Sequence, residues 1–134
     1  MAAILRVYGI MLLKGMGQTL LMTLLTLVIA TIIGMIFGLM NVGRNRVLNL
    51  IGTVYVDAIR GVPLIVLAYF VFFGIPAGMQ GMGMRGFRLS ALQAGTIALS
   101  LKCGAYMAEI IRAGIESVDR GQMEASRSLG LSYG

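Results

Sequence analysis

The chain has 134 residues, of which 58% are hydrophobic and only 12% are charged, and its mean hydropathy is +0.91. A soluble domain carries charge on about a quarter of its residues, so most of this surface must face lipid rather than water. The net charge of +6 comes from basic residues between apolar runs, without interleaved aromatic side chains, and this pattern argues against nucleic-acid binding.

Catalytic chemistry is poorly supported by the residue types present. The chain has no histidine, which excludes Ser-His-Asp and Cys-His sites and imidazole metal ligands. Its single cysteine, Cys103, lies in an apolar run, where we expect it to act as a small packed hydrophobe. We therefore expect a protein that is not an enzyme and needs no cofactor.

The first predicted element is a membrane-spanning helix over residues 15–41. Residues 15–43 carry no formal charge, and this stretch exceeds both the apolar core of about 7–15 residues in a signal peptide and the roughly 20 residues needed to cross a bilayer. Gly34 and Gly38 form a small-xxx-small pair, a common device for close helix contact in lipid. We expect a retained span within a helix bundle.

A second span is expected over residues 51–75, with Asp57 and Arg60 near its cytoplasmic boundary. Pro63 and Pro76 lie near the ends of the uncharged part of this segment. Two interpretations of Arg60 stay open: an anchor at the lipid headgroups, with Asp57 three residues earlier as an available partner, or a residue of the substrate path.

Residues 74–86 are predicted to form a loop, because Pro76 and repeated glycines interrupt a helix. Met79, Met82 and Met84 suggest thioether ligands for Cu(I). Methionines on an apolar loop are more often interfacial filler, so no metal site is predicted.

The third predicted span covers residues 89–117, and Lys102 and Glu109 interrupt its apolar run. An ammonium group inside a membrane needs a wet cavity or a partner. One hypothesis places Lys102 in the substrate path, where it attracts the carboxylate of an amino acid. The alternatives are pairing with Glu109 on the same face and snorkelling to the interface.

The third span is expected to continue beyond the membrane as a charged stalk. Glu109, Arg112, Glu116 and Arg120 alternate in charge at spacings of three or four residues, which bring side chains together on a helix. Positive-inside reasoning places this basic tail in the cytoplasm, and three spans then place the N-terminus outside.

A short second helix is predicted after the stalk, over about residues 120–130. Asp119 and Gln122 have the spacing of a capping box, and Gly130 suits the left-handed position that ends a helix. The apolar Met123 and Leu129 lie between these ends. A short capped helix outside the membrane can press on a cytoplasmic partner.

Residues 124–130 read Glu-Ala-Ser-Arg-Ser-Leu-Gly, which resembles the EAA loop, Glu-Ala-Ala-x-x-x-Gly, of the permease subunits of bacterial ABC importers. Residues 104–122, 60–64 and 20–38 look like the polar amino-acid branch of that family, which serves histidine, glutamate, glutamine, arginine and opines. The similarity covers nearly the whole chain.

The resemblance implies an all-α integral membrane fold with three transmembrane helices followed by a short cytoplasmic coupling helix. That helix would dock on an ABC ATPase subunit, whose movement switches two permease subunits between inward-facing and outward-facing states. The implied partners are this ATPase, a second permease subunit in a homo- or heterodimer, and an extracytoplasmic solute-binding protein. The implied location is the bacterial inner membrane. ATP hydrolysis would belong to the separate subunit, because the chain has no P-loop signature.

Carried over by position, Glu124, Ala125 and Gly130 match the motif, and Ser126 replaces its second alanine. The expected docking or shaping residues are Gly114, Asp119, Gln122, Glu124, Ala125, Ser126, Leu129 and Gly130. Members of the family continue past the EAA loop into further membrane helices, so we expect a truncated fragment that cannot transport alone.

Two other classes of protein compete with this interpretation. A small three-helix membrane scaffold or regulatory protein would use the tail only for solubility. An intramembrane enzyme is disfavoured by the missing histidine and paired-carboxylate site. The residues leave open which amino acid is transported.

Overall fold

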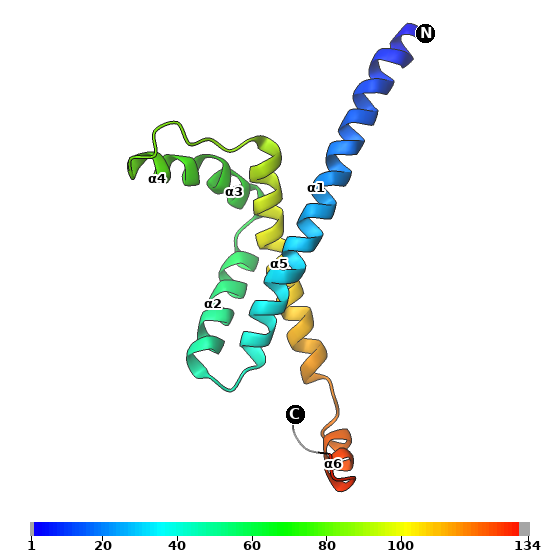
Figure 1. Cartoon of the computed structure of the whole chain (residues 1–134), viewed down its shortest axis with the longest axis vertical. Helices are drawn as coiled ribbons and strands as arrows, with labels where there is room; N and C mark the ends of the chain where they lie inside the picture. Colours follow the sequence, from blue (N-terminus) through cyan, green and yellow to red (C-terminus); the bar gives the residue numbers. More distant parts are fainter. Residues whose placement is uncertain (1, 132–134) are drawn as a thin grey trace.

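The computed structural model describes residues 2–131, and α-helices dominate it (Figure 1). In chain order the elements are α1 (Ala2–Val42), α2 (Arg46–Gly61), α3 (Leu64–Tyr69), the π-helix η1 (Phe70–Gly74), α4 (Ile75–Gly81), α5 (Ala91–Glu116) and α6 (Arg120–Ser128). The long α1 and α5 cross and pack on each other, and α2 lies beside their lower halves. The α3–α4 arm runs crosswise, and α6 hangs from the end of α5 (Figure 1).

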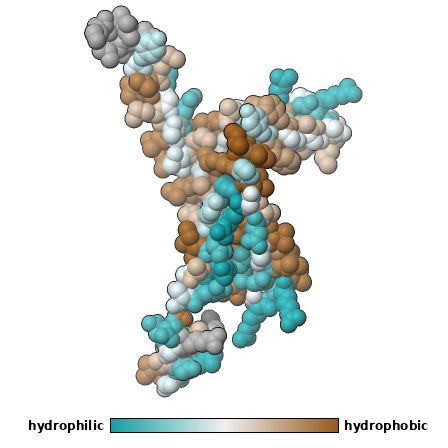
Figure 2. Space-filling view, turned by 180° about the vertical axis from the view of Figure 1, so that it is seen from behind, coloured by the Kyte–Doolittle hydropathy of each residue, from teal (hydrophilic) through white to brown (hydrophobic). Residues whose placement is uncertain are grey.

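Among the described residues, three helical segments are long and apolar enough to cross a membrane: Tyr8–Val42, Leu64–Gly81 and Ala91–Glu116. Large hydrophobic side chains such as Leu13 and Leu20 are exposed along α1. Apolar surface covers much of the face in Figure 2, whereas polar surface lies over the turn between α1 and α2, along the middle of the molecule and at the tip of the α3–α4 arm, and α6 is mixed. A surface of this kind is suited to contact with lipid.

The prediction of one continuous helix over residues 51–75 is wrong. The helix starts earlier, at Arg46, and ends at Gly61. Val62 is extended, with φ −79° and ψ 130°, because the ring of a following proline disfavours the α conformation. Pro63 then forms the N-cap of α3, with φ −57° and ψ 140°. The spanning segment is therefore 64–81, and α2 is a separate helix.

The predicted loop over residues 74–86 is also corrected, because α4 extends through Gly81. Pro76 lies in the first turn of α4, where its missing N–H and fixed φ are tolerated. The preceding turn widens into η1, in which the N–H of Ile75 donates to the carbonyl of Phe70, five residues back. The loop begins after α4 and uses Gly83 and Gly86 at φ +96° and +91°.

Small residues lie where α1 and α5 cross, in keeping with the helix bundle that the sequence predicts. A Cβ on Gly34 would lie 2.5 Å from the Cβ of Met107, and one on Gly38 would lie 3.0 Å from the carbonyl oxygen of Ala108. Gly104 and Ala108 are buried on α5. In lipid, where hydrophobicity does not drive pairing, this close backbone approach supplies the packing.

Candidate functional site: the end of α5, the free helix α6 and the break after α2

The end of α5 carries an ion-pair ladder that extends the helix beyond its apolar part. Arg112 Nη2 lies 2.5 Å from Glu109 Oε1, and Arg112 Nη1 lies 2.6 Å from Glu116 Oε2. These two pairs confirm the predicted spacing. The third expected pair, Glu116 with Arg120, depends on a side chain outside the described ones. The ladder supports a helical stalk up to Glu116.

The N-terminus of α6 is capped, although not by the predicted capping box. The carboxylate of Asp119 accepts from the N–H of Gly121 at 2.8 Å. Among the described hydrogen bonds, the side chain of Gln122 does not reach back to Asp119. The capping box of this chain lies instead at the start of α5, where Ser90 and Gln93 bond reciprocally at 3.2 and 2.9 Å. In the sequence, the Ser-x-x-Gln spacing of Ser90 and Gln93 before an apolar run indicates this capping box.

The C-terminus of α6 ends in the predicted left-handed glycine, because Gly130 has φ +78°. Its N–H donates to the carbonyl of Arg127 at 3.0 Å, and the N–H of Leu131 donates to the carbonyl of Ser126 at 3.1 Å. These two bonds form a Schellman motif, which satisfies carbonyls that a helix end leaves open. Both ends of this short helix are therefore closed by its own residues.

Within residues 2–131, α6 makes no contact with the other helices, and Figure 1 shows it apart from the bundle. Leu129 is 82% exposed and Met123 is 44% exposed. Ala125 is exposed, and the carboxylate of Glu124 has no hydrogen bond or ion pair among the described side chains. The helix thus presents exposed apolar groups, together with an acid that is unpaired among the described side chains, to its surroundings.

Two further expected docking residues have distinct settings. Among the described residues, a Cβ on Gly114 would meet no atom within 4 Å, so their packing does not require a glycine there. The carbonyl of Gly114 accepts from Ser117 Oγ at 2.8 Å, at the end of α5. Ser126 is half-buried, and its hydroxyl donates to the carbonyl of Met123 at 2.9 Å.

Lys102 reaches the break between α2 and α3, which is formed by the extended Val62 and by Pro63. Its Nζ donates to the carbonyl oxygens of Ile59, Arg60 and Val62 at 2.9, 3.0 and 2.6 Å. An ammonium group has three donors, and all three are used here. Pairing with Glu109, one of the alternatives from the sequence, does not occur.

Arg60, rather than Lys102, pairs with Glu109. Its Nη1 lies 3.8 Å from Glu109 Oε2, and its Cζ lies 5.4 Å from the ring centroid of Tyr106. The available pairing of Arg60 with Asp57 is not among the ion pairs of the described residues. Arg60 and Lys102 therefore lie beside the same Tyr106 ring, but Arg60 pairs with a carboxylate and Lys102 bonds backbone carbonyls.

A polar cavity of about 310 Å³ opens between α1, α2 and α5. Its lining consists of Asn41, Asn49, Thr53, Val56, Asp57, Arg60, Glu109, Arg112 and Glu116. Asn41 is buried, and its Oδ1 has no hydrogen-bond partner within the described part of the chain. Arg60 lines this cavity but Lys102 does not, so only Arg60 is placed to meet a polar solute there. The sequence alone did not bring these side chains together.

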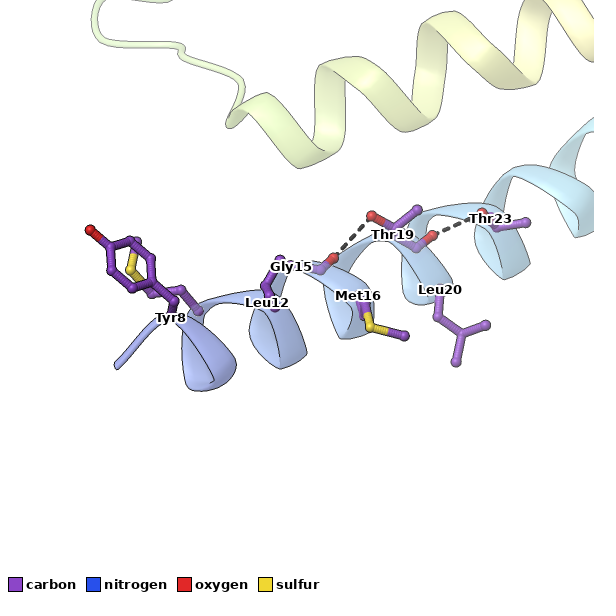
Figure 3. A pocket seen from close by; sticks show the side chains of 8 residues that line it. Tyr8, Leu12, Gly15, Met16, Thr19, Leu20 and Thr23 are labelled. Atoms are coloured by element: carbon purple, nitrogen blue, oxygen red, sulfur yellow. Dashed lines mark hydrogen bonds between the residues drawn. The ribbon is translucent and has the colours of Figure 1, made fainter. Parts of the chain in front are cut away.

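A hollow of about 720 Å³ lies along one face of α1 and is mostly apolar (Figure 3). The hydroxyl of Thr19 donates to the carbonyl of Gly15 at 2.9 Å, and that of Thr23 donates to the carbonyl of Thr19 at 2.8 Å. These hydroxyl groups are satisfied by their own helix. The hollow suits lipid or another helix rather than a polar solute.

Comparison with known proteins decides the family. Residues 30–134 match the family described as "Binding-protein-dependent transport system inner membrane component". The chain belongs to this family. The match includes the break after α2, all of α5 and α6, and so covers every residue of the candidate site.

Curated relatives carry names from amino-acid transport. The "Probable glutamine ABC transporter permease protein GlnM" of Bacillus subtilis (strain 168) is 39% identical over 92% of this chain and 54% of that protein. The "Arginine transport system permease protein ArtQ" of the same organism is 36% identical over 91% of this chain and 53% of that protein. The chain spans about half the length of the curated relatives it matches. These relatives are named as permeases rather than as enzymes.

A solved structure shares the fold. The chain superposes on one titled "Crystal structure of an amino acid ABC transporter with histidines" with a TM-score of 0.80 and 36% identity, over 94% of this chain and 56% of the other. This likeness confirms the predicted all-α membrane fold. With the family match, it confirms the resemblance on which the sequence interpretation rests.

Proposed function

We propose that this chain acts in the permease subunit of an ATP-driven importer for polar amino acids, with α6 as the helix that couples it to an ATPase subunit. The observation that carries the proposal is the state of α6: capped at both ends, separate from the bundle, and presenting Glu124 and Leu129 outward. The names of the relatives support the amino-acid substrate class.

The proposed mechanism is alternating access driven through α5. Closure of two ATPase subunits displaces α6, and the short link after Glu116 passes this displacement to α5. Because α5 packs closely on α1 through Gly34 and Gly104, the two helices move together. A second permease subunit, in a homo- or heterodimer, would complete the path.

The proposed location is the bacterial inner membrane, with α6 in the cytoplasm and the N-terminus outside. Positive residues support this orientation, because the cytoplasmic side carries more of them in membrane proteins. The turn between α1 and α2, the end of α5 and α6 lie at one end of the molecule (Figure 1), and the sequence of these elements contains Arg44, Arg46, Arg112, Arg120 and Arg127. The start of α1 and the loop after α4 lie at the opposite end, and their sequence contains Arg6, Lys14, Arg85 and Arg88. A solute-binding protein would deliver substrate at the opposite end.

Arg60 is proposed as a substrate-path residue, because it lines the polar cavity beside Glu109. A solute carboxylate entering the cavity would compete with Glu109 for its guanidinium. The hypothesis that Lys102 contacts substrate stays a prediction, and it requires the ammonium to leave its three carbonyl acceptors.

The docking role of α6 is tested by co-purification of ABC ATPase subunits from membranes that contain the tagged chain. The change Glu124→Lys should lower the amount captured about tenfold or more, equivalent to at least 1.4 kcal/mol of binding free energy. Asp57→Lys makes the same change of charge at an exposed position outside α6 and should leave capture unchanged. Equal capture by Glu124→Lys and the unaltered chain would contradict the docking role. If the unaltered chain captures no ATPase, the scaffold interpretation is favoured.

A further inference from the structure

The break after α2 leaves backbone carbonyls without helical partners inside a largely apolar protein. A helix ends with carbonyls that have no N–H four residues ahead, and such groups are costly to leave unpaired in a membrane. The extended Val62 and the proline after it stop the ladder at this point. Something outside α2 must therefore supply the missing donors.

Lys102 supplies these donors from another helix. Its ammonium bonds the carbonyls of Ile59, Arg60 and Val62, which lie 43, 42 and 40 residues earlier in the chain. A cation is also favoured at a helix C-terminus, where the backbone dipoles leave partial negative charge. Lys102 is thus a helix cap delivered by α5 to the end of α2.

Neighbouring residues on α5 strengthen the same junction. The hydroxyl of Tyr55, on α2, donates to the carbonyl of Leu101 at 2.9 Å. The ring of Tyr106, one turn beyond Lys102, lies 5.6 Å from Lys102 Nζ and 5.4 Å from Arg60 Cζ. Three positions along one stretch of α5 therefore contact the second half of α2.

We propose that Lys102 is a positioning residue that fastens the break between α2 and α3 to α5. This proposal rests on the proposed function in one respect. Movement of α6 and α5 would carry the end of α2, and with it the start of the α3–α4 arm. Lys102 then acts on transport through the backbone it holds rather than through contact with the solute.

The fastening is tested by hydrogen exchange of backbone amides across residues 59–67, in the permease purified in lipid nanodiscs. Lys102→Met removes the donors at similar side-chain length and should speed exchange in this segment about tenfold or more. Lys102→Arg keeps a cation with several donors and should restore slow exchange. Lys14→Met, at the only other lysine and an exposed position on α1, is the matched control and should change nothing in the segment.

The transport consequence is tested with the same variants in proteoliposomes that contain the complete importer. Lys102→Met should lower solute imported per ATP hydrolysed about fivefold or more, whereas ATPase capture and the KM for neutral and anionic amino acids stay unchanged. Selective loss of affinity for anionic amino acids would overturn the proposal in favour of direct substrate contact. Unchanged exchange in Lys102→Met would overturn the fastening itself, whether or not the importer transports amino acids.

The proposal stays testable if Lys102→Met fails to accumulate in membranes. If Lys102→Met is lost, Lys102→Gln, whose amide keeps two donors, takes its place in the exchange measurement. Accumulation of Lys102→Arg and Lys102→Gln with slow exchange supports the cap. Loss of all three variants alike would show that the position needs lysine for another reason and would overturn the proposal.

Discussion

Tyr55 on α2 donates a hydrogen bond of 2.9 Å to the carbonyl oxygen of Leu101 on α5, while its ring stacks on Phe37 of α1 with centroids 4.0 Å apart. One side chain therefore joins the three helices of the lower bundle. Leu101 directly precedes Lys102, so this bond and the lysine cap hold the same part of α2 to α5.

Removing the Tyr55 hydroxyl should weaken this junction without disturbing the ring stack. We expect Tyr55→Phe to lower the free energy of unfolding by about 1 kcal/mol, the typical net value of one such bond. Thermal unfolding in detergent micelles measures the change. Tyr69→Phe is the control, because Tyr69 is 60% exposed and its ring stacks on Phe73. Equal stability of Tyr55→Phe and the unaltered chain would show that the bond contributes nothing.

The close crossing of α1 and α5 should tolerate no side chain at Gly34. We expect Gly34→Val to destabilise the bundle by about 1–3 kcal/mol, as overpacking does elsewhere, because its Cβ would lie 2.5 Å from that of Met107. Gly17→Val is the matched control, since a Cβ there meets nothing within 4 Å. The measurement compares the unfolding midpoints of the two variants, and Gly34→Val should unfold at the lower midpoint. A larger loss in Gly17→Val would contradict the packing assigned to α1 and α5.

The ion-pair ladder on α5 should respond unequally to loss of its two acids. Glu109 contacts both Arg112 and Arg60, whereas Glu116 contacts only Arg112 among the described side chains. We therefore expect Glu109→Gln to lower the unfolding temperature more than Glu116→Gln does, and high salt to reduce both effects because it screens exposed charges. The reverse order would show that the pair of Arg60 with Glu109 is not formed in the membrane.

Two glycines near α6 should behave in opposite ways when changed to alanine. Gly130→Ala must hold φ at +78°, which costs about 1–2 kcal/mol for an L residue, so the helix end should unwind and ATPase capture should fall. Gly114→Ala places its Cβ with no neighbouring atom of the described residues within 4 Å and should favour helix by up to about 1 kcal/mol. If Gly114→Ala nevertheless loses capture, the partner occupies the space beside it. Full capture by Gly130→Ala would show that docking does not need the Schellman end.

The sequence predicted the elements whose signals are local. Apolar length located α1 and α5, charge spacing predicted the pairs of Arg112, and Gly130 marked the end of α6. The break after α2 was missed because its apolar composition continues through Val62 and Pro63 into α3, although the proline restricts the residue before it. The helix α4 was mistaken for a loop because Pro76 was taken as a breaker, whereas a first helical turn accepts proline.

The surroundings of Lys102 were beyond sequence reasoning for a different reason. An intramembrane ammonium signals that it needs partners, and charge alone suggested the carboxylate of Glu109. The actual acceptors are backbone carbonyls about 40 residues earlier, which became available only because α2 stops there. Backbone acceptors have no signature in the side-chain sequence, so the fold had to bring them together with Lys102.

The separation of α6 from the bundle has a consequence for how such proteins change over time. Nine helical residues without tertiary packing are marginal in water, and the caps at Asp119 and Gly130 are the contacts that favour the helix. A partner surface would complete its folding. If α6 docks on an ATPase subunit as proposed, substitutions at its exposed positions would change which subunit binds, while the packing of the other helices stays unchanged.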